Sequence, residues 1–267
     1  MSTTGSHEDP DDHRWLVLGI CCLSLLIVGT DTTIVNVALP AIHRSLHASL
    51  SGLQWIVDAY TLVLGSFLML GGSTGDRLGR RRVFQTGLVT FVIGSALCAA
   101  APSIGVLIVA RALQGVSGAL LTPAALAIIV SVFPRNERGA AIGKWTAWGG
   151  IGILAGPLLG GQIVDSASWR WIFVINVPLV MIALFLSRIA VPGRAQGMSG
   201  AGRHGIDWLG AAFAATGLAG ISFGLIEQPV LGWSDPGVWG ALVIGLVMLA
   251  TFIYHEAHTA APMLPLG

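Results

Sequence analysis

Three ionisable side chains interrupt long apolar stretches of this sequence: Asp31, Asp58 and Arg111. A charged group is costly in the hydrocarbon interior of a membrane, so each of these residues is a candidate for function. The chemistry open to them is proton binding by a carboxylate and charge pairing by a guanidinium. Because a buried arginine needs an acidic or carbonyl partner, we expect Arg111 to interact with an acid.

The surrounding composition is that of an integral membrane protein. Hydrophobic residues make up 54% of the chain and charged residues only 10%, whereas soluble domains carry about 25% charged residues. A helix needs about 20 apolar residues to span a bilayer, and the runs show no period-2 alternation, which predicts an all-α membrane protein with eight spans. The predicted spans are 15–36, 52–72, 83–101, 104–130, 141–164, 171–190, 208–226 and 238–255. The net charge of +1 provides no basic surface for nucleic acid.

The distribution of Lys and Arg predicts the orientation of these spans. With a cytoplasmic N-terminus, eleven of the fourteen basic residues fall on the cytoplasmic side; Arg44 and Arg170 fall outside, and Arg111 lies within a span. Basic residues are retained in the cytoplasm during insertion. We therefore expect a multi-pass protein with its N-terminus in the cytoplasm. The composition does not fix the organism, and we expect the membrane to be a bacterial inner (plasma) membrane.

Helix geometry indicates which acid meets Arg111. Asp31 lies 16 residues after Trp15, which is about 24 Å into a hydrocarbon core about 30 Å thick. Arg111 and Asp58 each lie roughly 10 Å below the outer boundary. Asp31 is therefore the nearest acid by depth, and we expect its protonation to release Arg111. The alternative is a static, structural Asp31–Arg111 ion pair with no role in transport. The position of Asp58 fits simple exposure to water near the membrane interface as well as it fits a functional role.

A short charged segment, residues 72–82, joins the second and third predicted spans. Its charge marks the cytoplasmic face, but neither the acid before the arginines nor the flanking glycines follow from topology. The pattern G-x-x-x-D-R-x-G-R-R is formed by Gly72, Asp76, Arg77, Gly79, Arg80 and Arg81. We expect Asp76 to accept from Arg80 or from helix N-terminal amides, and Arg77 and Arg81 to reach acids such as Glu137.

The fifth predicted span carries glycines at every fourth position. They leave one helix face without side chains, along which another backbone can approach closely, and Pro157 removes one internal hydrogen bond and bends the helix. The residues of this seam are Gly152, Gly156, Pro157, Gly160 and Gly161. Ordinary packing of small residues in a membrane bundle is the alternative reading.

Together these patterns resemble the major facilitator superfamily, and within it the fourteen-helix branch of drug:proton antiporters. The segment 72–82 resembles the signature loop between helices 2 and 3, and the seam resembles the antiporter motif of helix 5. Residues 31–40 (DTTIVNVALP) are similar to the first-helix motif, and residues 169–178 (WRWIFVINVP) to the start of the sixth helix. The fourth-helix pattern L-x-x-x-R-x-x-Q-G-x-x-G is matched by Leu107, Arg111, Gln114, Gly115 and Gly118.

This resemblance implies a domain organisation. We expect a disordered cytoplasmic tail (1–13), a six-helix N-terminal bundle (14–190), a cytoplasmic linker (191–206), and two additional helices with a truncated end (207–267). The branch has six further helices, so we expect an incomplete form or one that needs a complementary second half. A homodimer that supplies the missing wall is the less favoured alternative.

The function implied is proton-coupled efflux of hydrophobic or cationic drug-like molecules, driven by the proton gradient without a cofactor. In the family the fourth-helix arginine is associated with proton coupling, the charged loop acts as a latch, and the glycine seam lies where two halves rock against each other. With one half absent, the seam is expected to face lipid. The rival is a non-transporting fragment of such an exporter. A membrane enzyme ranks third, because no nucleophile–base or metal constellation accompanies the spans, and His255, Glu256 and His258 fit a solvated face better than a metal site.

Overall fold

The computed structural model describes residues 10–192 and 207–259, which form helices joined by short turns. The helices are α1 (Pro10–Leu46), α2 (Leu50–Leu78), α3 (Arg80–Ala100), α4 (Ile104–Val132), α5 (Arg138–Ser166), α6 (Trp171–Val174), α7 (Asn176–Ala190), α8 (Trp208–Leu231) and α9 (Pro236–His258). Eight stretches are long and apolar enough to cross a membrane, with Trp171–Ala190 acting as one span. The all-α membrane fold with eight spans is confirmed in the described residues.

Several helices begin at a side chain that caps the first turn. Ser49 begins α2 by accepting a hydrogen bond from the Gly52 amide at 3.1 Å, and Asp207 begins α8 in the same way through the Gly210 amide at 2.8 Å. Such side chains satisfy amides that have no partner within the helix. The first helix starts at Pro10, inside the tail expected for residues 1–13. The rest of that tail, most of the predicted linker (193–206) and the end of the chain (260–267) lie outside the described residues.

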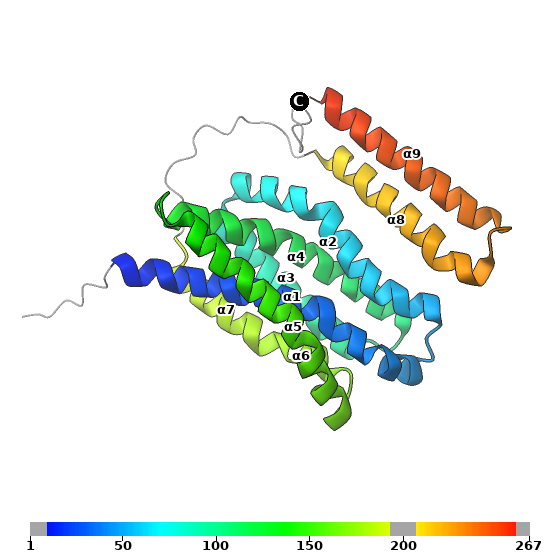
Figure 1. The fold of residues 1–267 in the computed structure, drawn as a ribbon, viewed down its shortest axis with the longest axis horizontal. Helices are drawn as coiled ribbons and strands as arrows, with labels where there is room; N and C mark the ends of the chain where they lie inside the picture. The colour runs from blue at the N-terminus through cyan, green and yellow to red at the C-terminus, as the bar shows by residue number, and fades with distance from the viewer. Residues whose placement is uncertain (1–9, 193–206, 260–267) are drawn as a thin grey trace, which may run out of the picture.

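Helices α1 to α7 form one bundle, and α8 and α9 form an antiparallel pair beside it (Figure 1). The pair packs against α2 through α8. Trp55 of α2 donates from its indole nitrogen to Glu227 of α8 at 3.2 Å, and its ring lies 6.3 Å from that of Phe223. The helix pair is therefore held against the bundle by both a polar and an aromatic contact.

The bundle has two apolar cores, one toward each end of its helices. Along α1, the first core includes residues from Val17 to Val28, and the second includes residues from Ile34 to Ile42. Along α4, Leu107 and Ala110 belong to the second core, whereas the first begins at Leu121. The turns of α1 and α4 that carry Asp31 and Arg111 therefore lie between the two apolar cores.

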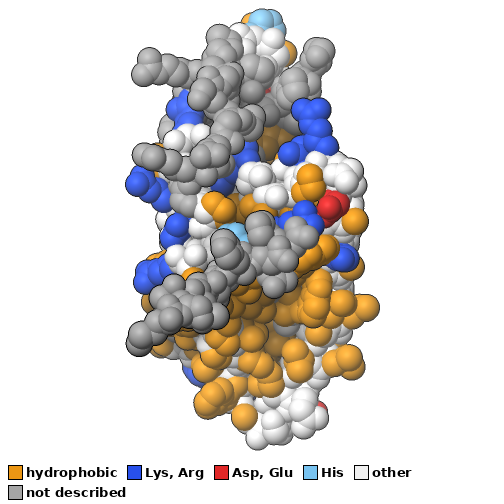
Figure 2. Space-filling view, turned by 90° about the vertical axis from the view of Figure 1, so that its left-hand side faces the viewer, with side chains coloured by type: hydrophobic (Ala, Val, Ile, Leu, Met, Phe, Trp, Pro, Cys, Tyr) orange, Lys and Arg blue, Asp and Glu red, His pale blue; other side chains and the backbone are white. Residues whose placement is uncertain are grey.

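Basic side chains gather at one end of the bundle, called the basic end below. This end carries the start of α1, the α2–α3 turn and the α4–α5 turn, and Figure 2 shows Lys and Arg side chains on this face with hydrophobic side chains beyond them. The basic residues of these segments and of the end of α7 are Arg14, Arg77, Arg80, Arg81, Arg82, Arg135, Arg138, Lys144 and Arg188.

Candidate functional site

The structure brings Asp31 of α1 and Arg111 of α4 into direct contact. The Arg111 Nη1 atom lies 2.5 Å from Asp31 Oδ2, and both side chains have no exposed surface. The two residues are separated by 80 positions in the sequence. This contact is the ion pair expected from the depth of the two residues in their spans.

Amide side chains complete the environment of the Asp31 carboxylate. Its Oδ1 atom accepts from Asn176 Nδ2 of α7 at 2.9 Å and from Gln114 Nε2 of α4 at 3.3 Å. Gln114 also donates to Ser95 Oγ of α3 at 2.9 Å, and its oxygen accepts from Arg111 Nη1 at 3.0 Å. Both carboxylate oxygens are thus bonded, which is the condition for keeping a carboxylate in a region without water.

The guanidinium of Arg111 is anchored on its other side by α2. Its Nε atom donates to the backbone oxygen of Ile56 at 3.1 Å, and its Cζ atom lies 4.3 Å from the centre of the Tyr60 ring. A cation over an aromatic face is stabilised most where water is excluded. Among the described residues, Arg111 Nη2 has no hydrogen-bond acceptor, so the guanidinium is not fully satisfied by the residues around it.

This arrangement joins side chains or backbone from α1, α2, α3, α4 and α7 around one carboxylate. Removing one partner of a buried ion pair leaves an uncompensated charge, which costs about 3–5 kcal/mol. Adding a proton to the carboxylate has a related effect, because it cancels the charge that Arg111 pairs with. The charge on this one carboxylate is therefore balanced by contacts that involve five helices.

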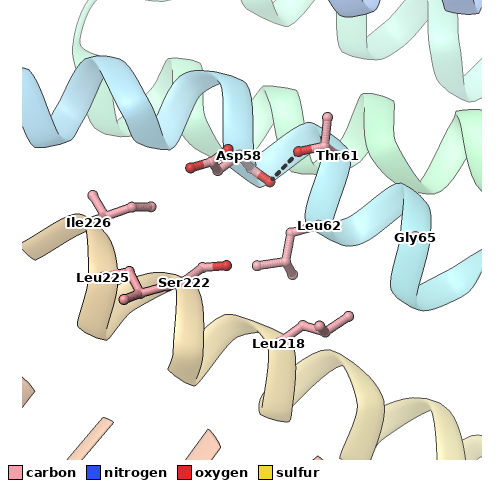
Figure 3. Close-up of a pocket in the computed structure, with 8 residues that line it drawn as sticks. All are labelled: Asp58, Thr61, Leu62, Gly65, Leu218, Ser222, Leu225 and Ile226. Carbon is pink, nitrogen blue, oxygen red and sulfur yellow. Dashed lines mark hydrogen bonds between the residues drawn. The ribbon is translucent and has the colours of Figure 1, made fainter. Parts of the chain in front are cut away.

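Asp58 lies apart from this network. It is half-buried on α2 and lines a pocket of about 370 Å³ between α2 and α8 (Figure 3). Leu218, Ser222, Leu225 and Ile226 form the α8 side of that pocket. The sequence grouped Asp58 with Asp31 and Arg111, but the structure places it in a separate, largely apolar groove.

The predicted loop at residues 72–82 is almost entirely helical. Helix α2 continues to Leu78 and α3 begins at Arg80, so the turn consists of Gly79 alone, which has φ 95°. A positive φ of this kind favours glycine, because it has no Cβ. Gly72, Asp76 and Arg77 therefore lie on the last turns of α2 rather than in a loop.

The charged residues around Gly79 link three parts of the basic end. Arg80 lies 3.2 Å from Asp76, one of the partners expected for that acid, and Arg80 also donates to the backbone oxygen of Ala127 on α4 at 3.0 Å. Arg81 donates to the backbone oxygen of Arg188 at the end of α7 at 2.7 Å. The cluster thus ties the α2–α3 turn to α4 and α7.

The expectation that Arg77 and Arg81 reach Glu137 is wrong in the described residues. Glu137 lies 3.4 Å from Arg14 of α1 instead, while Arg81 contacts α7. The α4–α5 turn is therefore tied to the start of α1 and not to the start of α3.

The glycine seam of α5 packs against α1 along its length. A Cβ atom at Gly152 would lie 2.4 Å from the Leu26 oxygen, and one at Gly156 would collide with Thr33. At Gly160 the Cβ would lie 2.9 Å from Ile34 Cγ1, and at Gly161 it would make an ordinary contact with Val37 at 4.0 Å. The expectation that this seam faces lipid or a second half is wrong, because α1 of the same bundle occupies it.

The other face of α5 is the exposed one. Pro157, which follows Gly156, is exposed, and Leu154 and Leu158 are 73% and 78% exposed. The seam glycines thus serve close packing within the bundle, and the apolar face opposite them has no partner among the described residues.

The histidines near the end of α9 do not assemble a metal site in the described residues. His255 Nε2 lies 2.9 Å from Asp207 Oδ2 at the start of α8, and His258 Nδ1 lies 2.8 Å from the Tyr254 oxygen. The first contact joins the start of α8 to the last turn of α9.

Three members of the network were not singled out from the sequence: Asn176, Ser95 and Tyr60. Asn176 lay within the sixth-helix motif, and a fully buried asparagine in an apolar span is a usable signal because its amide needs partners. Ser95 and Tyr60 give no comparable signal in the sequence, because serine is common within membrane spans and tyrosine is common near their ends. Gln114 was noted only as part of a pattern, and its contact with Asp31 gives it a physical role.

Eight apolar helical stretches long enough to span a membrane, packed around a buried carboxylate–guanidinium pair, define a multi-pass membrane protein. Residues 21–255 match the Major Facilitator Superfamily. The chain belongs to this family.

Several curated relatives share this sequence at moderate identity. The chain is 40% identical over 261 residues to puromycin resistance protein pur8 of Streptomyces alboniger, covering 97% of this chain and 51% of that protein. It is 33% identical over 277 residues to the tetracenomycin C resistance and export protein of Streptomyces glaucescens, covering 99% of this chain and 51% of that protein. The chain thus spans about half the length of these relatives.

Solved structures show the same fold at low identity. A bacterial homologue of the human lysosomal transporter Spinster, in an inward-facing and occupied conformation, aligns with a TM-score of 0.61 at 20% identity, covering 94% of this chain and 63% of that one. The proton:xylose symporter XylE aligns with a TM-score of 0.61 at 14% identity, covering 94% of this chain and 55% of that one.

Proposed function

We propose that this chain is the proton-coupling part of an exporter that moves hydrophobic or cationic drug-like molecules out of the cell in exchange for protons. The observation that carries this proposal is the buried contact between Asp31 and Arg111. Ionisable residues inside a helical membrane bundle mark substrate or ion pathways, so we assign this pair to transport.

The proposed coupling step is the binding of one proton by Asp31. The proton neutralises the carboxylate, so the ionic contact with Arg111 Nη1 is lost, while Arg111 keeps its bonds to the Ile56 oxygen and to Gln114. Arg111 is then free to move with α2 and α4, whereas Asp31 moves with α1. Loss of the proton to the other side of the membrane restores the pair and resets the bundle.

Asp58 has a different place in this proposal. Its half-buried carboxylate lines an open, mostly apolar pocket, which suits a hydrophobic molecule with a positive charge better than a proton relay. In this proposal Asp31 binds the proton, and Asp58 contacts the transported molecule.

The basic end supports a cytoplasmic location for the N-terminus. Basic residues are retained on the cytoplasmic side during insertion, and α1, the α2–α3 turn and the α4–α5 turn bring theirs to the same end of the bundle. We therefore propose a bacterial inner membrane protein with that end in the cytoplasm. In this orientation the charged cluster around Gly79, which contacts α4 and α7, acts as a latch at the cytoplasmic face.

We further propose that a second helical bundle completes the transport path. Secondary transporters bind substrate between two repeats that move against each other, the chain covers 51% of its relative pur8, and the exposed apolar face of α5 offers a surface for such a partner. A non-transporting membrane fragment is the second candidate, and the same half-length coverage favours it.

The test is efflux from liposomes with an imposed proton gradient, using puromycin as the probe because it is the compound named for the relative pur8. The polypeptide is assayed alone and fused to the second half of pur8. We expect gradient-dependent efflux by the fusion. Asp31→Asn should abolish that efflux without lowering the amount of protein in the membrane.

The matched control is Asp165→Asn, which removes an exposed acid near the end of α5 and should leave efflux unchanged. Undiminished efflux by the Asp31→Asn fusion would refute the coupling role. A fusion that inserts but never transports would favour the non-transporting fragment. Efflux by the polypeptide alone would show that the second bundle is not required.

A further inference from the structure

A second groove, unrelated to the ion pair, lies between α1 and α5 near the basic end. It has a volume of about 300 Å³. Leu18, Cys22 and Leu23 of α1 supply an apolar lining, and Gly19 of the same helix leaves open space where a side chain would project. The lining residues of α1 run from Trp15 to Leu23, which is about 12 Å of helix.

Two exposed tryptophans and one lysine border this groove. Trp15 is 42% exposed and Trp148 is 46% exposed, and Lys144 Nζ lies 4.1 Å from the centre of the Trp15 ring. Lys144 is six residues after the start of α5 at Arg138, so it lies about 9 Å into the helix. Tryptophan belongs at the level of lipid headgroups, and lysine reaches that level by extending along an apolar surface.

The charge of the groove is positive. No acidic side chain is among the described residues that line it, and the neighbouring Arg14 is offset by Glu137 at 3.4 Å. The groove therefore presents one ammonium group above an apolar slot, at the end of the molecule where other basic residues gather.

We propose that this groove binds one anionic phospholipid, with its phosphate on Lys144 and one acyl chain along Gly19. An apolar helix from a protein partner would bury the Lys144 ammonium without a counter-charge, which is costly, whereas a lipid phosphate supplies that charge. A free phosphate ion would leave the apolar slot uncovered. The groove shares no residue with the ion-pair network, and its occupancy does not depend on the exporter proposal.

The test is native mass spectrometry of the detergent-purified polypeptide titrated with phosphatidylglycerol or phosphatidylcholine of identical acyl chains. The wild-type chain should retain one phosphatidylglycerol about five-fold more tightly than phosphatidylcholine, the factor expected for one lysine near an anionic headgroup. Lys144→Gln should remove that preference. Arg82→Gln, which removes an exposed arginine of the same end, should keep it.

A second variant tests the slot itself. Gly19→Leu fills the open space and should weaken retention of both lipids, whereas Gly143→Leu, at another open and exposed glycine, should not. Inorganic phosphate at millimolar concentration should leave the bound lipid in place. An unchanged preference in Lys144→Gln, equal effects of the two glycine variants, or displacement by phosphate would each overturn the proposal.

Discussion

Adding one methyl group at Gly152 tests how α1 and α5 are joined. In the structure, the Cβ of Gly152→Ala would lie 2.4 Å from the Leu26 oxygen and 3.1 Å from the Leu26 carbonyl carbon and Cα. All three are backbone atoms, so no side-chain rotation relieves the overlap. Reaching even a tight contact of 3.4 Å requires the two helices to separate locally by about 1 Å, the difference between 3.4 and 2.4 Å.

The cost of this separation sets the expected size of the effect. Overpacking a well-packed core destabilises a protein by about 1–3 kcal/mol, and each kcal/mol lowers the melting temperature of a chain of this size by about 2–4 °C. We therefore expect Gly152→Ala to lower the apparent melting temperature by about 2–12 °C. The assay is thermal unfolding of the purified chain in detergent.

Two glycines on the same helix serve as controls. Gly150 faces open space, so Gly150→Ala should not lower the melting temperature, because alanine favours the helix more than glycine does. At Gly149 the nearest atoms are all in the Leu25 side chain, so Gly149→Ala should be rescued by Leu25→Ala, whereas the backbone overlap at Gly152 has no such rescue. If Gly152→Ala melts like the wild type, the close packing of α5 on α1 is refuted. If Gly152→Ala abolishes transport without lowering the melting temperature, the glycine seam would instead act between the two transporter halves that move against each other.

Two further substitutions test the other contacts. Tyr60→Leu should lower the melting temperature by about 4–8 °C, because it removes a cation–ring contact worth about 2 kcal/mol in a desolvated site, whereas Tyr60→Phe keeps the ring; equal melting of both variants would contradict a role for the ring. Asp76→Asn should impair transport more than membrane insertion, because it removes the charge opposite Arg80 while a partly exposed pair contributes only about 0–1 kcal/mol to stability. If Asp76→Asn lowers efflux and the amount of protein in the membrane to the same extent, the Asp76–Arg80 pair has a purely topological role.

Much of the fold follows from local properties of the sequence. Eight apolar stretches of membrane length predicted eight spans, because each helix satisfies its own backbone in lipid. The same reasoning identified Asp31 and Arg111, since charged residues stand out against apolar spans. Their pairing was predictable because depth along a helix can be counted from the sequence at a fixed rise per residue.

The remaining parts depend on which helices are neighbours. The glycine pattern predicted a close approach along α5 but gave no information on the partner, because most apolar helix faces look alike in lipid. Asp58 was at a suitable depth to join the ion pair, yet it faces α8 on the other side of α2. The sequence predicts a loop at residues 72–82, but the turn is Gly79 alone. Polar residues after the apolar span continue helix α2, because Gly79 is enough to reverse the direction of the chain.

The sequence alone thus determined that the chain spans a membrane, how often, and which charged groups lie inside it. Only the tertiary structure decided that Asn176, 145 residues away, completes the environment of Asp31, and that α1 and α5 enclose both a glycine contact and a basic groove. The physical reason is that hydropathy and periodicity are summed along one helix, whereas a binding site is made of side chains that meet across several.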